Sequence, residues 1–258
     1  MKKKDTSWGS VATWYEGMVS DDDSYQTQVI APNLLRLMDL HADEKILDLA
    51  CGTGFFSEMF ARIVGSKNVS GVDVGKQLIA IAKQKNSEID FRISAADDLS
   101  IFPANHFDKI AIVLAIQNIA EVKAMFQEIN RVLKSTGSVY VVMNHPAFRI
   151  PKRSSWGFDE IAGRQYRRVD GYLHESKEEI DMSPGLSKNE TSAAVTVSFH
   201  RPIQYYTKLF AGAGFAMTHL EEWVSHKRSG SGPRQKEEDR MRSEIPLFLF
   251  MEISKDVR

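Results

Sequence analysis

The sequence predicts an α/β protein built on a doubly wound, mainly parallel β-sheet, and three observations support this prediction. Short apolar runs alternate with segments whose apolar residues recur at helical spacing. This alternation repeats five times between residues 45 and 143. The first apolar run passes directly into a glycine-containing stretch, LDLACGTGFF at residues 47–56. Ligands of such sheets bind at the carboxyl ends of the strands, so we expect the functional site there.

The individual elements follow from these patterns. Strands are expected at residues 45–49, 69–74, 91–93, 110–114 and 139–143. The run at 110–114 is continuously apolar, which is typical of a strand covered on both faces. Helices are expected after the glycines, where Phe55, Phe56, Met59, Phe60 and Ile63 share one face, and over residues 76–84 and 122–133.

The regular pattern stops after Met143 and returns only near residue 193. Residues 144 to about 188 have no clean period but contain aromatic residues, a cluster of arginines and a turn signal at 183–185. A strand at 193–200, a helix at 203–213 and strands at 215–223 and 247–254 are expected beyond them. The polar segment 225–243 is interpreted as a solvated loop or an exposed helix. We predict a single domain over residues 1–258 with an insertion at 144–200.

Composition and charge limit the possible partners. Charged residues make up 26% of the chain, the net charge is −1 and the pI is about 6.7, so no overall attraction to nucleic acid or an anionic membrane is expected. No stretch approaches the length of a membrane helix, and the lysines at positions 2–4 precede no apolar run. The single cysteine, Cys51, cannot form an internal disulfide. We expect a cytoplasmic protein, a monomer or homodimer, with a small-molecule partner.

The glycine turn and two carboxylates indicate the ligand. Gly52 and Gly54 stand where the first strand passes to its helix, so the backbone can approach a ligand closely and a side chain at Gly54 is expected to obstruct it. Asp73 ends the second strand about 20 residues later, a spacing suited to hydrogen bonds from ribose hydroxyls. Asp48 would repel a pyrophosphate but favour an ammonium or sulfonium group. S-adenosylmethionine has these cationic groups and a ribose but no phosphate.

With these residues, the sequence resembles the class I S-adenosylmethionine-dependent methyltransferases, in particular the small-molecule type 11-like group. DLACGTG at residues 48–54 is similar to the first motif of the family, and FDKIAIVLAIQNI (107–119) and EINRVLKSTGSVYVV (128–142) look like its fourth-strand and fifth-strand segments. The resemblance implies a Rossmann-like, seven-stranded sheet with an antiparallel last strand and a cap inserted after strand five. It also implies S-adenosylmethionine as cofactor and S-adenosylhomocysteine as product.

The resemblance also implies where the cofactor lies. The expected contacts are Tyr15, Asp48, Ala50, Gly52, Gly54, Asp73, Val74, Ala96, Asp97 and Leu114. Tyr15 belongs to an N-terminal segment, residues 1–30, of the kind that the family uses as a lid; a plain core role is the alternative. Ala95 stands where the family commonly has the Asp that holds adenine, which leaves the Ala96 backbone and Asp97 or Asp98 as candidates.

Candidate acceptor residues lie beyond the cofactor motif. Methyl transfer is an in-line displacement at carbon, which needs a base only if the acceptor arrives protonated. His145 and His200 follow or end strands near the site and are candidate bases or positioning residues, with a structural hydrogen bond as the alternative for each. Acceptor contacts are expected from Asn144, Phe148, Trp156, Arg168, Tyr172 and Tyr205. No metal is expected, because the His and acidic residues lack ligand spacing.

The predicted function is therefore direct methyl transfer from S-adenosylmethionine to a small molecule, and other classes stay open. An RNA or protein methyltransferase is one alternative, since basic residues at 164–168 and 227–242 would form a local footprint. Against a nucleic-acid enzyme, no Asn/Asp-Pro-Pro-aromatic motif follows the fourth strand. The second alternative is a non-catalytic S-adenosylmethionine-binding Rossmann module. A nicotinamide dehydrogenase is opposed by Asp48.

Overall fold

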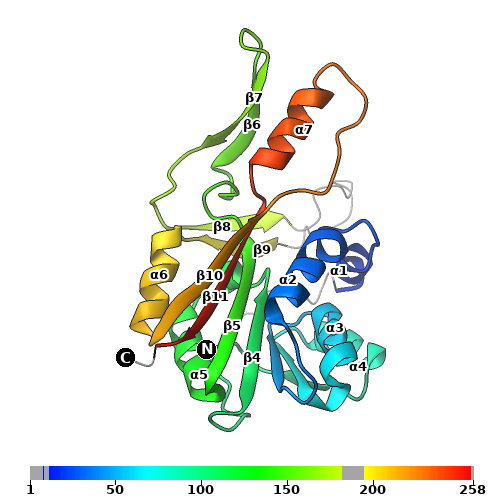
Figure 1. Ribbon diagram of the computed structural model, residues 1–258, viewed down its shortest axis with the longest axis vertical. Coiled ribbons are helices and arrows are strands. Elements are labelled where there is room, and N and C mark those ends of the chain that lie inside the picture. The colour runs from blue at the N-terminus through cyan, green and yellow to red at the C-terminus, as the bar shows by residue number, and fades with distance from the viewer. Residues whose placement is uncertain (1–7, 9–11, 182–194, 257–258) are drawn as a thin grey trace.

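A seven-stranded sheet with strand order β10-β11-β5-β4-β1-β2-β3 forms the centre of the computed structural model, which describes residues 8, 12–181 and 195–256, without the side chains of residues 13–15 (Figure 1). The strands are β1 (Ile46–Leu49), β2 (Val69–Asp73), β3 (Asp90–Ile93), β4 (Phe107–Val113), β5 (Leu133–Asn144), β10 (Phe215–Trp223) and β11 (Phe248–Lys255). Strand β11 runs antiparallel to both of its neighbours, and the other pairs are parallel. The predicted mainly parallel sheet with an antiparallel last strand is confirmed.

Helices cover both faces of this sheet (Figure 1). One face packs against α5 (Val122–Val132) and α6 (Ile203–Gly212), and the other against α2 (Ala31–Met38), α3 (Phe55–Val64) and α4 (Lys76–Lys85). The remaining helices are α1 (Ala12–Val19), α7 (Gln235–Glu244), the π-helix η2 (Gln26–Ile30) and the 3-10 helices η3 (Ser66–Asn68) and η4 (Ile116–Asn118). Helices on both faces of the sheet give three layers, as expected for strands that are apolar on both faces.

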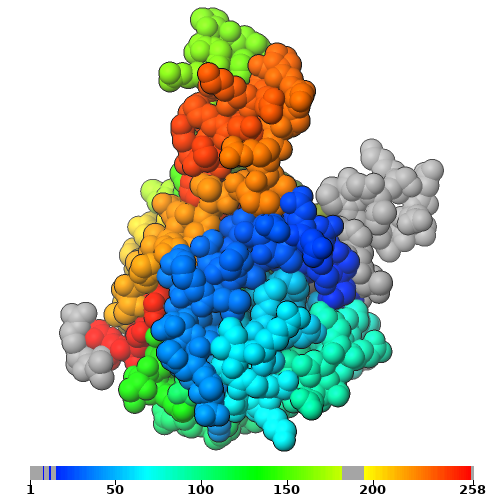
Figure 2. Space-filling model, turned by 45° about the vertical axis from the view of Figure 1, so that its right-hand side comes forward, coloured from blue at the N-terminus to red at the C-terminus, as the bar shows by residue number. Residues whose placement is uncertain are grey.

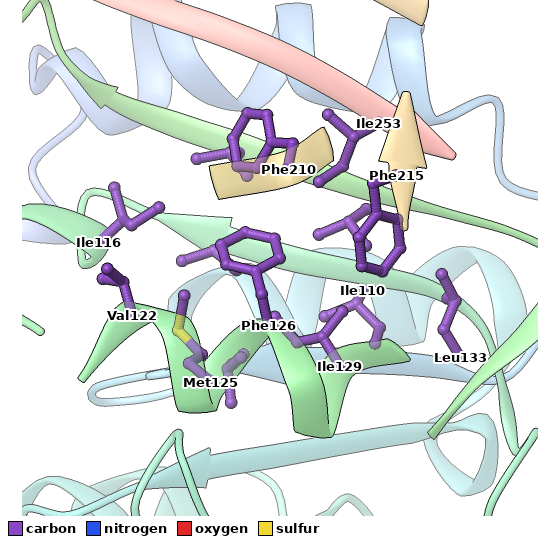
Figure 3. Close-up of a cluster of buried hydrophobic side chains, with 14 of the residues drawn as sticks. Ile110, Ile116, Val122, Met125, Phe126, Ile129, Leu133, Phe210, Phe215 and Ile253 are labelled. Atoms are coloured by element: carbon purple, nitrogen blue, oxygen red, sulfur yellow. The ribbon is translucent and has the colours of Figure 1, made fainter. Parts of the chain in front are cut away.

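Successive side chains of each strand point to opposite faces of the sheet, so they contribute to two separate hydrophobic cores. In β4, Ile110 and Ile112 point into the α5–α6 layer, whereas Ala111 belongs to the opposite cluster. Figure 3 shows Phe126 of α5 packed between the strands and Phe210 of α6. The rings of Phe126 and Phe210 lie 5.1 Å apart, and all of these side chains are fully buried. The continuous apolar run at 110–114 is thus explained by burial from both sides.

The insertion contains more regular structure than the sequence predicts. β6 (Ser154–Asp159) and β7 (Arg164–Val169) form an antiparallel hairpin, and β8 (Ser176–Asp181) pairs with β9 (Val195–His200). Strands β7 and β8 are not predicted from the sequence, because each carries polar residues on both faces, whereas β9 lies within the strand expected at 193–200. The turn signal at 183–185 and the first residues of the strand expected at 193–200 lie outside the described residues.

The hairpin β6–β7 and helix α7 project together from the carboxyl end of the sheet (Figures 1 and 2). Arg240 of α7 forms ion pairs with Glu237 and Glu244 on the same helix and donates to the backbone oxygen of Gln165 in β7. For residues Gln235–Glu244, the helix interpretation of the polar segment is confirmed. The hairpin contributes Trp156 and Arg167 to the lining of the larger of the two cavities described below.

A side chain at Gly54 would point into the hydrophobic core. A Cβ atom there would lie 2.8 Å from the Phe91 ring, and φ is +80°, so the expectation that it would obstruct the ligand is corrected. Gly163 also has a positive φ, of +62°, but a Cβ atom there would have no atom within 4 Å. It therefore isolates the cost of the left-handed backbone, about 1–2 kcal/mol.

Gly54→Ala is expected to lower the free energy of unfolding by roughly 1–3 kcal/mol more than Gly163→Ala, because overpacking adds to the backbone cost. Urea denaturation of the two variants measures the difference. Equal losses in both would mean that the core around Phe91 adapts freely and that the packing argument fails.

Candidate active site

The turn between β1 and α3 is held in an unusual backbone conformation. Ala50, Gly52 and Gly54 have φ values of 61°, 56° and 80°, and Leu114 at the end of β4 has 54°. Such values in non-glycine residues cost free energy and cluster at functional sites. The turn is fixed by hydrogen bonds from the Cys51 N–H to the Val72 carbonyl and from the Gly54 N–H to the Cys51 carbonyl, both at 3.0 Å.

Asp73 ties this turn to the end of β2. Its Oδ2 accepts a hydrogen bond from the Gly52 N–H at 3.0 Å, and its Oδ1 accepts one from the Gly75 N–H at 2.8 Å. A carboxylate accepts hydrogen bonds at both of its oxygens, which is the chemistry that ribose hydroxyls require. Val74, the next residue, is half exposed. The fold therefore brings Asp73 to the glycine turn, and its contact with a ribose stays a prediction.

Asp48 lies under the same turn and is almost completely buried, with 2% of its surface exposed. The Ser57 hydroxyl donates a hydrogen bond to its Oδ2 at 2.6 Å. The pKa of Asp48 is raised to about 7, mainly by burial and in addition by the negative charge of Asp73, while the Ser57 hydrogen bond opposes both effects. Near neutral pH the group is poised between acid and carboxylate, and a nearby cation would favour the carboxylate.

A small cavity lies beside Asp48. Its volume is about 20 Å³, and its lining includes Asp48, Ala50 and Leu114 of the predicted cofactor contacts. A volume of this size holds about one water molecule. Two further lining residues, Val19 and Gln26, come from the N-terminal segment that was expected to act as a lid. The segment closes over the turn here.

Two other predicted cofactor contacts, Ala96 and Asp97, are not among the residues that line this cavity. Ala96 is half buried and packs against the core beneath α5, and Asp97 follows it in the loop after β3. That loop is attached to the site, because the Ser94 N–H donates to the Asp73 carbonyl at 3.1 Å. Tyr15 belongs to α1, and its side chain lies outside the described residues.

A larger cavity of about 200 Å³ opens next to the insertion. It is lined by Tyr25, Phe148, Arg149, Trp156, Arg167, Ile245, Pro246 and Leu247. Phe148 and Trp156 are predicted acceptor contacts, whereas the other six were missed. Because Tyr25 lines this cavity and the adjacent Gln26 lines the small one, the two cavities lie on either side of one segment.

The predicted Arg168 is not brought to this cavity. It forms an ion pair with Asp170 at 2.7 Å, and both side chains are largely exposed. Its neighbour Arg167 lines the cavity instead, because successive residues of a strand face opposite sides. The Arg167 guanidinium stacks over Trp156, with its central carbon 4.9 Å from the ring centroid. The two residues are directly opposite each other in the β6–β7 hairpin.

His145 uses both ring nitrogens within the protein. Its Nε2 is 2.7 Å from Glu222 Oε1, and its Nδ1 accepts a hydrogen bond from the Ala147 N–H at 3.2 Å. The ring is buried and packs against Phe148 at 4.7 Å. Burial lowers the pKa of His145, and Glu222 opposes this shift. In this arrangement the neutral ring donates from Nε2 and has no free lone pair to accept a proton from a substrate. Asn144, beside it, is half buried at the end of β5 and pairs with Phe248.

His200, Tyr172 and Tyr205 form a separate group near α6. His200 Nε2 bonds to the Tyr172 carbonyl at 2.7 Å, so this nitrogen carries the proton. Within the described part of the chain Nδ1 makes no hydrogen bond and keeps its lone pair. The Tyr172 hydroxyl accepts a bond from the Ile203 N–H at 3.1 Å, and the Tyr205 ring lies 5.4 Å from the guanidinium of Arg201.

The described residues contain neither a group of metal ligands nor a helix that could span a membrane. Among residues 8, 12–181 and 195–256, no three His, Cys, Asp or Glu side chains are grouped so that they could hold a metal ion. In the same part of the chain, no helix has the length and apolar character needed to cross a bilayer.

Comparison with known proteins finds a family match for part of the chain. Residues 46–137 match the sequence profile of the family described as "Methyltransferase domain". Demethylmenaquinone methyltransferase of Chlorobaculum parvum is 30% identical over 120 residues, which cover 46% of this chain and 49% of that protein. Ubiquinone biosynthesis O-methyltransferase of Xanthomonas oryzae is 26% identical over 131 residues, 47% of this chain and 54% of that protein. The chain thus spans about half the length of the curated relatives it matches.

A solved structure extends the similarity to most of the fold. An S-adenosylmethionine-dependent methyltransferase from Mesorhizobium loti superposes with a TM-score of 0.67 at 24% identity, covering 86% of this chain and 95% of that one. At this identity the superposition concerns the fold alone. Residues 46–137 are thus similar to the methyltransferase domain family, and the seven-stranded sheet around them has the fold of that solved methyltransferase.

Proposed function

We propose that the protein transfers a methyl group from S-adenosylmethionine to a small-molecule acceptor. The observation that carries the proposal is the pair of carboxylates around the glycine turn, Asp48 beneath it and Asp73 hydrogen-bonded to its backbone. A cationic ligand suits the buried Asp48 and a ribose suits Asp73, whereas a pyrophosphate would be repelled. S-adenosylmethionine supplies the methyl group on a sulfonium.

Each residue of the site would have one defined role. Asp73 would accept hydrogen bonds from the ribose, Asp48 would face the cationic end, and the backbone at Gly52 would allow close approach. Val19 and Gln26 already close the small cavity, which supports a lid role for the N-terminal segment. Exclusion of water and orientation of the acceptor opposite the sulfur are then the main contributions to rate.

A small acceptor agrees with the size of the larger cavity and with the names of the relatives, which refer to demethylmenaquinone and ubiquinone biosynthesis. We include Phe148 and Trp156 among its contacts. Of the two candidate bases, His145 has both ring nitrogens bonded within the protein, whereas His200 keeps the lone pair of Nδ1 but is not among the residues that line this cavity.

The decisive experiment combines binding and turnover. Isothermal titration with S-adenosylhomocysteine should show one site per chain, and incubation of the protein with methyl-labelled cofactor and fractionated metabolite extract should yield a labelled small molecule, identified by mass spectrometry. Binding without transfer to any fraction would favour the non-catalytic module. Label recovered in RNA or protein would reject the small-molecule acceptor.

His145→Ala is expected to lower the free energy of unfolding by roughly 2–4 kcal/mol, because the ring packs in the core and its nitrogens are bonded within the protein. The turnover of the folded variant should change little. Denaturant titration and steady-state rates on the same preparation measure the two effects. A folded variant whose rate drops by about 10²-fold or more and recovers at high pH would instead show a general base.

A further inference from the structure

Two arginines of the larger cavity have no anionic partner among the residues that the structure describes. Arg149 lines the cavity and lies over the Phe248 ring, with 5.8 Å from its central carbon to the ring centroid. Arg167 donates from Nε to the Phe148 carbonyl at 2.8 Å and from Nη2 to the Ser154 hydroxyl at 2.7 Å. These partners are all neutral, so neither guanidinium charge is balanced by the contacts that position it.

The carboxylates of the surrounding elements are paired elsewhere. Glu222 contacts His145, Asp170 pairs with Arg168, Glu160 pairs with Arg234, and Glu237 pairs with Arg240. Within the part of the chain that the structure describes, Arg149 and Arg167 form no ion pair. Burial lowers the pKa of both groups, and the charge of Arg167 lowers that of Arg149 as well. Two like charges at one cavity are unfavourable unless an anion joins them.

The remaining walls of the cavity suit a flat apolar group. Tyr25, Phe148 and Trp156 contribute rings, and residues 245–247 add aliphatic surface. Trp156 is held in place by the stacked Arg167, although 42% of its surface is exposed. An apolar cavity of about 150 Å³ is known to accept benzene, so the 200 Å³ here has room for one ring with a small substituent.

We propose that this cavity binds an acceptor of the aromatic monocarboxylic acid class, with its carboxylate between Arg149 and Arg167 and its ring against Phe148 and Trp156. Guanidinium groups bind carboxylates through charge-assisted hydrogen bonds in a fixed planar geometry. The role of the acid as methyl acceptor rests on the proposed function, and the binding itself does not. Displacement of the segment at Tyr25 and Gln26 would open this cavity toward the one beside Asp48.

The test compares benzoate with benzamide, which has the same shape but no charge. Titration calorimetry on the wild-type protein, with and without saturating S-adenosylhomocysteine, should show benzoate binding at least tenfold more tightly than benzamide. Arg149→Met should weaken benzoate binding tenfold to a hundredfold and leave benzamide binding unchanged. Arg149→Lys, which keeps the charge, should retain most of the preference.

Arg168→Met is the matched control, because this neighbouring arginine is already paired with Asp170 outside the cavity. It should bind both probes as the wild type does. The proposal is overturned if the wild type binds no benzoate, if benzamide binds equally well, if inorganic phosphate binds as tightly as benzoate, or if Arg168→Met loses as much affinity as Arg149→Met. Failure to bind S-adenosylhomocysteine, measured on the same samples, would reject the proposed function and leave the benzoate result intact.

Discussion

Asp73→Ala is expected to weaken binding of S-adenosylhomocysteine by about tenfold to a hundredfold. Hydrogen bonds to a charged group contribute roughly 1.5–3 kcal/mol, and the variant loses those that the ribose would donate. It also frees the Gly52 and Gly75 N–H groups that the carboxylate now fixes, so the turn itself becomes less ordered. Calorimetric titration of the folded variant gives the change in affinity.

Two control variants separate these contributions. Asp73→Asn keeps one carbonyl oxygen as an acceptor and should lose less affinity than Asp73→Ala. Asp90→Ala removes a carboxylate from the neighbouring strand β3, where it pairs with Arg92 at the surface, and should bind normally. Unchanged affinity in a folded Asp73→Ala protein would remove Asp73 from the site.

The affinity of the wild-type protein for S-adenosylmethionine is expected to depend on pH, and Asp48→Asn is expected to abolish this dependence. Because the pKa of Asp48 is raised to about 7, the group is protonated in the ligand-free protein at lower pH, and a cation beside it must displace that proton. Wild-type affinity should therefore fall as the pH drops below 7, by up to tenfold per pH unit. The uncharged asparagine variant should bind more weakly at pH 7.5 and show a flat profile. Parallel profiles for the two proteins between pH 5.5 and 7.5 would contradict this role.

The same substitution is expected to change how stability varies with pH. The folded-state pKa of about 7 lies above the ordinary value of 3.8, so between these values the folded protein holds a proton that the unfolded chain has released. The contribution of Asp48 to stability is thus greatest at low pH and is lost as the pH rises to 7, by roughly 4 kcal/mol at most. Asp48→Asn should remove this loss, which urea midpoints at pH 5 and pH 8 would show.

Sequence periodicity predicted the central sheet well because each of its elements has a strongly apolar face or two. It did not predict β7 and β8, whose alternation involves polar residues on both faces. The strand ends around the glycine turn were predictable in the same way, and the fold brings Asp48, Ala50 and Leu114 together at the small cavity. Their role as cofactor contacts stays a prediction.

The larger cavity could not be predicted in the same way, because its residues depend on pairing register. Arg167 faces Trp156 only because the two are opposite in the β6–β7 hairpin, and a shift of one residue would place Arg168 there instead. Tyr25 and Arg149 reach the same cavity from distant segments. The internal bonding of His145 similarly depends on Glu222, which is 77 residues away in β10. None of these contacts has a local sequence signal.

The position of β11 between β5 and β10 has a consequence for folding during synthesis. β5 ends at residue 144, but the strand that pairs with its outer edge begins at residue 248. At about 5–20 residues per second, the ribosome needs roughly 5–20 s to make the chain between them. During that interval the edge of β5 is unpaired, and β10 has no neighbour to join. An open apolar edge of this kind can pair with other chains, so the nascent protein passes through a period of exposure to aggregation that ends only when β11 enters the sheet.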